Sequence, residues 1–105
     1  GVANGILFPY IVKYNEEAAF GKYQKIYNYI STEKKCESEF SKGMLEQAVR
    51  ELNAQVGIPA KLSDAGVTDE YFAQMTEDAM KSGNIAVNPR KTVREDILAL
   101  YNEAL

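Results

Sequence analysis

The sequence predicts an all-α fold, a helical bundle of about five helices joined by short, capped connections. In every strongly periodic segment, apolar residues recur at the three- and four-residue spacing of a helix. No segment shows the strict alternation of a half-buried strand. Capping residues and glycines stand where the periodic segments begin and end. Because the 105 residues contain no repeat or long linker, we expect one domain over residues 1–105.

The first predicted helix spans residues 2–14 and is apolar on nearly all sides. A helix of this kind is normally buried within a larger structure. Pro9 lies inside it, where the ring removes one backbone hydrogen bond and crowds the carbonyl of Gly5. Because glycine relieves part of that crowding, we expect a kink at Pro9 and not a helix end.

Two further helices are predicted over residues 20–30 and 38–56, each with one apolar stripe. The polar, charged residues 31–37 between them indicate a surface loop. Ser38 is the expected N-cap of the later helix, and Gly57 is the expected left-handed residue after its end. Pro59 then prevents the helix from continuing, because it disfavours helical geometry at the preceding residue.

The next helical segments are predicted from their capping residues. Residues 62–66 suggest a single turn capped by Ser63 and ended by Gly66. Thr68 is the expected cap of a fourth full helix, whose first turn holds acidic residues that the helix dipole favours. Gly83 is the expected end of that helix.

A stiff loop precedes the last predicted helix. Asn88 precedes Pro89 and is biased toward an extended conformation, and Arg90 has five donors that could bind carbonyls at helix ends. From the residues alone, we interpret Asn88, Pro89 and Arg90 as a structural loop between helices. Thr92 and Glu95 then have the spacing of a capping box that opens the helix.

Composition excludes several classes of function. The net charge of −3 gives no basic stripe for nucleic acid, so no nucleic-acid partner is expected. The longest apolar run has seven residues, where a membrane span needs roughly 20, so no membrane partner is expected either. Cys36 is the only cysteine, which rules out an internal disulfide and favours a reducing, cytoplasmic location.

The absence of histidine limits the chemistry of this chain most strongly. Histidine is the commonest general acid–base and catalytic metal ligand, and the sequence has none. Neighbouring acids such as Glu16 and Glu17 diverge by about 100° on a helix and do not suit paired acid–base work. The glycines form no phosphate-binding motif. We therefore expect no catalytic residue, no metal ligand and no bound cofactor within these residues.

Three segments together resemble the group III, iron-containing alcohol dehydrogenases. They occur in the family's order and at its spacing, and the match covers essentially the whole chain except residues 31–37. The segments are residues 1–10 (Gly-Val-Ala-Asn-Gly-Ile-Leu-Phe-Pro-Tyr), residues 57–59 with 62–67, and residues 88–90 with Thr92, 95–97 and Tyr101.

The resemblance implies that this chain is the C-terminal part of a larger, two-domain enzyme. An N-terminal domain would bind NAD(P), and the helical domain would hold Fe²⁺ (or Zn²⁺) on one aspartate and three histidines. The last of those histidines would precede Gly1, so no ligand or catalytic residue has a match here, and this portion alone is expected to be inactive. Substrates in the family are short-chain alcohols or diols and their aldehydes.

Two sets of residues receive a role from the resemblance. Val2, Ala3 and Asn4 would pack around the metal site, because they begin the helix that follows the last ligand. Asn84 would line the substrate pocket, because the family's loop before Asn88 approaches it.

The implied partners are the nucleotide-binding domain and the metal-bearing helices of the parent enzyme. Self-association through the apolar first helix is also expected when the chain is alone. A free-standing helical protein–protein interaction module is the alternative reading. The apolar first helix counts against it, since an independent module would show a polar face there.

Overall fold

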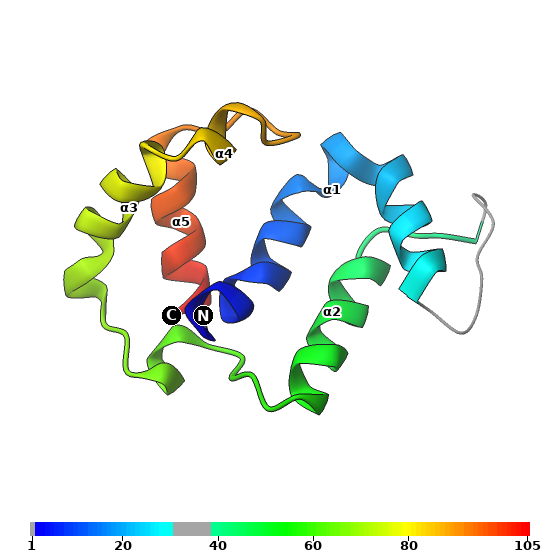
Figure 1. Ribbon diagram of the computed structural model, residues 1–105, viewed down its shortest axis with the longest axis horizontal. Helices are drawn as coiled ribbons and strands as arrows, with labels where there is room; N and C mark the ends of the chain where they lie inside the picture. Colours follow the sequence, from blue (N-terminus) through cyan, green and yellow to red (C-terminus); the bar gives the residue numbers. More distant parts are fainter. Residues whose placement is uncertain (1, 31–38) are drawn as a thin grey trace.

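The computed structural model describes residues 2–30 and 39–105, which contain helices and no strand. The predicted all-α fold of about five helices is therefore confirmed (Figure 1). In no described helix is there a stretch long and apolar enough to cross a membrane. The predicted loop with Cys36, and the Ser38 cap, lie outside the described residues. The helices are α1 (Val2–Ile30), α2 (Met44–Gln55), α3 (Phe72–Met80), α4 (Gly83–Ala86) and α5 (Arg94–Ala104), with 3-10 turns η1 (Leu62–Ala65) and η2 (Asp69–Tyr71).

The first two predicted helices form one bent element, α1. Residues 15–19 continue the helix, and the backbone leaves helical geometry only at Ala19 (φ −129°, ψ 20°). Pro9, where a kink was expected, lies within helical backbone. In Figure 1 the first part of α1 lies between α2 on one side and α3 and α5 on the other, and its second part turns beside the start of α2.

Two hydrophobic clusters form the core, and α1 contributes to both of them. The first joins the middle and second part of α1 to α2, through Val12, Ala19, Tyr23, Phe40, Leu45 and Val49. The second joins the first part of α1 to η1, α3 and α5, through Ile6, Tyr10, Leu62, Phe72 and Ala104. The apolar character of α1 on many sides follows from this shared position.

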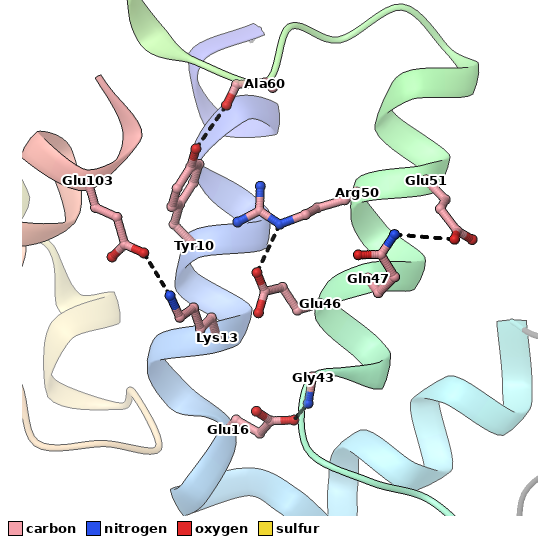
Figure 2. Close-up of polar contacts among 10 residues, drawn as sticks. All are labelled: Tyr10, Lys13, Glu16, Gly43, Glu46, Gln47, Arg50, Glu51, Ala60 and Glu103. Atoms are coloured by element: carbon pink, nitrogen blue, oxygen red, sulfur yellow. Dashed lines mark hydrogen bonds and ion pairs between the residues drawn. The ribbon is translucent and has the colours of Figure 1, made fainter.

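Polar contacts also join α1 to its neighbours (Figure 2). Tyr10 donates its hydroxyl proton to the carbonyl of Ala60, with an oxygen–oxygen distance of 3.0 Å. Lys13 forms an ion pair of 2.9 Å with Glu103 of α5. That pair is well exposed, so its contribution to stability is small.

The predicted helix-ending glycine at position 57 is confirmed. Gly57 has φ 81°, and two backbone hydrogen bonds close the end of α2, from Ile58 N to Asn53 O (2.9 Å) and from Gly57 N to Ala54 O (3.3 Å). This pair of bonds is the Schellman motif. Gly66 likewise ends η1 with φ 82°, as predicted.

The predicted helix starts are less accurate. The helix expected from residue 38 begins at Met44, because Gly43 has φ 89° and interrupts helical geometry. Ser63 does not cap η1; its hydroxyl donates to the main-chain oxygen of Leu105 at 2.6 Å. Gly83 does not end α3, which stops at Met80, but begins the short helix α4.

The start of α5 also differs from the predicted capping box. Val93 occupies the N-cap position, and the carboxylate of Asp96 accepts a hydrogen bond of 2.9 Å from its backbone N–H. That hydrogen bond lowers the pKa of the Asp96 carboxyl. Thr92 thus lies one residue before the N-cap position, and its hydroxyl donates to the carbonyl of Arg90 at 2.9 Å.

Candidate functional site

A cavity of about 350 Å³ lies among α1, α3, α4 and α5. One face of α1 forms a wall, because residues 4, 7, 11 and 14 recur at helical spacing. The apolar part of the lining includes Leu7, Ile11, Ile85, Ile97 and Leu100. The polar part includes Asn4, Tyr14, Asn84, Asn88 and Thr92.

Among the residues that the structure describes, no charged side chain lines the cavity. Amide and hydroxyl groups can donate or accept hydrogen bonds without a net charge. A ligand that suits this lining is small and neutral, with one or two oxygen atoms on an apolar body. An anionic or strongly cationic ligand would lose hydration without finding an opposite charge.

The structure brings some of the predicted site residues together at this cavity. Asn4 at the start of α1, Asn84 in α4 and Asn88 in the following loop all line it. Val2 and Ala3 are exposed on α1 and do not line it. The backbone of Asn84 is fixed by Ser82, whose hydroxyl oxygen accepts a hydrogen bond of 3.2 Å from the Asn84 N–H.

The loop of Asn88, Pro89 and Arg90 is attached to α1 by side chains. Arg90 donates from Nη1 to the carbonyl oxygen of Tyr14 at 3.0 Å, and its guanidinium lies 4.0 Å from the centre of the Tyr14 ring. Asn88 exchanges two amide hydrogen bonds with Asn15. Tyr14 and Asn15 of α1 thus meet Asn88 and Arg90 of the loop at one end of the cavity.

Sequence reasoning missed Tyr14 and Asn15 as residues of this site. Asn15 was in a stretch that no predicted helix covered, and Tyr14, the last residue of the first predicted helix, was given no role in a site. The sequence could have indicated Asn15, because position 15 continues the helical spacing of positions 4, 7 and 11 and so lies on the same helix face. An amide on such a face needs a buried partner.

The described residues do not form a metal site. No three histidine, cysteine, aspartate or glutamate side chains come together within residues 2–30 and 39–105. The sequence as a whole has no histidine. The residues of this chain therefore do not supply the three histidines of the ligand set that the resemblance implies.

Comparison with known proteins matches the whole chain to one family. The family model described as "Fe-containing alcohol dehydrogenase family, C-terminal" matches residues 1–105. The chain is 34% identical to 1,3-propanediol dehydrogenase of Citrobacter freundii, over 99% of this chain and 27% of that protein. It is 35% identical to lactaldehyde reductase of Escherichia coli K12, over 99% of this chain and 28% of that protein. It is 27% identical to NADPH-dependent butanol dehydrogenase of Clostridium saccharobutylicum, over 96% of this chain and 27% of that protein. The chain thus spans little more than a quarter of these relatives' length.

Proposed function

The chain belongs to the iron-containing alcohol dehydrogenase family as its C-terminal domain, and on that basis we propose that it is part of an NAD(P)-linked, metal-dependent alcohol dehydrogenase. The parent would interconvert short-chain alcohols or diols with their aldehydes. The names of the relatives support this substrate class, since they include a propanediol dehydrogenase, a lactaldehyde reductase and a butanol dehydrogenase.

The uncharged cavity is the observation that supports this proposal best. Its apolar side chains suit the carbon chain of a short alcohol, and its amides suit one hydroxyl or carbonyl oxygen. We assign to this chain one wall of the substrate pocket and packing next to the metal site. Fe²⁺ or Zn²⁺ and the nucleotide would be held by other parts of the parent, so the chain alone is proposed to be inactive.

Asn84 is the residue for which we expect a direct effect on substrate. Replacing Asn84 by alanine in the complete enzyme that we propose contains this chain should lower kcat/KM about 5- to 10-fold. This loss corresponds to one hydrogen bond of roughly 1–1.5 kcal/mol. The measurement is steady-state kinetics with 1,3-propanediol and 1-butanol.

Lys81→Ala is the matched control for Asn84→Ala. Lys81 is an exposed residue at the end of α3 and does not line the cavity. Its replacement should leave kcat/KM unchanged within a factor of two. Equal effects of both substitutions would contradict the role that we assign to Asn84.

Part of α1 exposes large apolar side chains, and we propose that they contact other parts of the parent. Phe8 is 51% exposed, and Val2 and Ile11 are also exposed. Burial of about 300 Å² of such surface is worth roughly 7 kcal/mol. The 105-residue chain by itself is therefore expected to self-associate and to bind a hydrophobic dye.

Sedimentation of the isolated chain tests this expectation. Phe8→Lys should shift the chain toward monomer and weaken dye binding. Tyr29→Lys, a change of an equally large exposed residue on the far part of α1, is the control. A wild-type chain that stays monomeric and binds no dye would refute the proposed contact surface.

A further inference from the structure

The wall of the cavity formed by α4 has little packing of its own. This helix has four residues, Gly83–Ala86, and none of them is buried. Its local support consists of the hydrogen bond that the Ser82 hydroxyl accepts from Asn84 N–H and of backbone hydrogen bonds from Ile85 N to Ser82 O and from Asn88 N to Ile85 O. A short exposed helix contributes little stability by itself. The position of Asn84 relative to α1 therefore depends on the loop that follows α4.

That loop is held to α1 by a reciprocal pair of amide hydrogen bonds. Asn15 Nδ2 donates to Asn88 Oδ1 at 2.9 Å, and Asn88 Nδ2 donates to Asn15 Oδ1 at 2.8 Å. Asn15 is only 6% exposed. Because Asn15 is buried, breaking this pair leaves its amide unsatisfied, which favours the observed position of the loop on α1.

The loop is also rigid within itself. Asn88 Nδ2 lies 2.7 Å from the carbonyl oxygen of Arg90 and 3.2 Å from the Thr92 hydroxyl. Pro89 fixes its own φ between them. Because Asn84 lies four residues before Asn88, a displacement of Asn88 would move Asn84 as well.

We propose that Asn15 is a positioning residue for the substrate pocket. Through Asn88, Asn15 sets the separation between two walls of the cavity. One wall is the face of α1 with Asn4 and Leu7, and the other is α4 with Asn84 and Ile85. This inference rests on the proposed function, because it takes the cavity to be the alcohol pocket. Asn15 does not line the cavity itself and acts through the loop.

The test uses the complete enzyme with Asn15→Leu, which keeps the side-chain size and removes both amide hydrogen bonds. We expect faster amide hydrogen exchange in residues 82–93 and no change in the exchange of α2. We also expect a 10- to 100-fold loss of kcat/KM for 1,3-propanediol and 1-butanol, mainly through KM, as for a displacement of about 1 Å. Asn88→Ala removes the same pair from the loop side, so the test does not depend on the folding of one variant.

A double-mutant cycle distinguishes a specific pair from general loosening. Asn15→Leu combined with Asn88→Ala should be no worse than Asn88→Ala alone, because the pair is already broken in that variant. Asn53→Ala is the control, since Asn53 also ties α1 to another helix by donating to Gly5 O at 2.9 Å, away from this loop. It should leave the exchange of residues 82–93 unchanged.

Each outcome decides the proposal. Unchanged exchange in Asn15→Leu would overturn the anchoring of the loop. Faster exchange with unchanged KM would overturn the effect on the pocket. A wild-type enzyme without activity on either alcohol would overturn the proposed function and with it the effect of Asn15 on substrate. The hydrogen-exchange data would still show whether Asn15 anchors the loop.

Discussion

Leu62→Ala is expected to remove 3–5 kcal/mol of stability, roughly the cost of a large cavity in a well-packed core. Leu62 is fully buried in η1, where it packs with Ile6 of α1, Phe72 of α3 and Ala104 of α5. A single side chain therefore holds four elements together. Since a small domain has only about 5–15 kcal/mol in total, this loss is a large fraction of its stability, and the urea midpoint should fall sharply.

Urea unfolding followed by circular dichroism measures this loss. Leu52→Ala is the matched control, because it deletes the same atoms from an exposed position on α2. It should cost less than about 1 kcal/mol. Similar midpoints for the two variants would mean that η1 is not part of a cooperative core.

The helix ends show which parts of the fold local sequence can predict. Gly57 and Gly66 were predicted correctly, because a left-handed residue after a helix is a local requirement that glycine meets best. The cap at Ser63 was wrong for a tertiary reason, because its hydroxyl donates to the main-chain oxygen of Leu105, 42 residues away. The cap at Thr92 was wrong for a local reason, because Val93 takes the N-cap position and the Thr92 hydroxyl donates to the carbonyl of Arg90, two residues earlier. A polar capping residue thus predicts the position of a turn more reliably than the hydrogen bonds that its side chain forms.

In the candidate site, too, the sequence identified some residues and missed others that depend on tertiary contacts. Asn84 received its pocket role from the family resemblance, and Asn88, four residues later, was interpreted as part of a structural loop. Asn15 is 73 residues from Asn88, so its partner depends on how α1 passes the α4–α5 loop. The polar residues 15–17 also hid the continuity of α1, because periodicity of apolar residues does not detect a polar helix turn with buried partners.

Glu16 is the clearest example of a residue whose role the sequence did not indicate. Glu16 and Glu17 were interpreted as unsuited to paired acid–base work, and the structure gives the two side chains different surroundings. Glu17 has an 87% exposed side chain, 3.5 Å from Lys42. Glu16 is 3% exposed, and its carboxylate accepts a hydrogen bond of 2.6 Å from Gly43 N–H at the start of α2 (Figure 2).

The position of Glu16 explains how α2 begins without a side-chain cap of its own. Gly43 is the N-cap residue, and no side chain caps the first turn locally. A carboxylate from α1 at this point is favoured by the positive end of the helix dipole. Nearby, Tyr23 donates to Val12 O at 2.9 Å; burial first, and the Glu16 charge second, raise the pKa of its hydroxyl.

Glu16→Ala is therefore expected to cost about 1.5–3 kcal/mol, the range for a hydrogen bond to a charged group. Glu16→Gln should lose less, because the amide oxygen can still accept from Gly43 N–H, and it should lower the pKa of Tyr23. Glu17→Ala should change stability by less than about 1 kcal/mol, as for an exposed ion pair. The measurements are urea unfolding of the three variants and spectrophotometric titration of the tyrosines. Equal losses for Glu16→Ala and Glu17→Ala would show that the carboxylate of Glu16 does not hold the start of α2, and that the first cluster is stabilised by its apolar side chains alone.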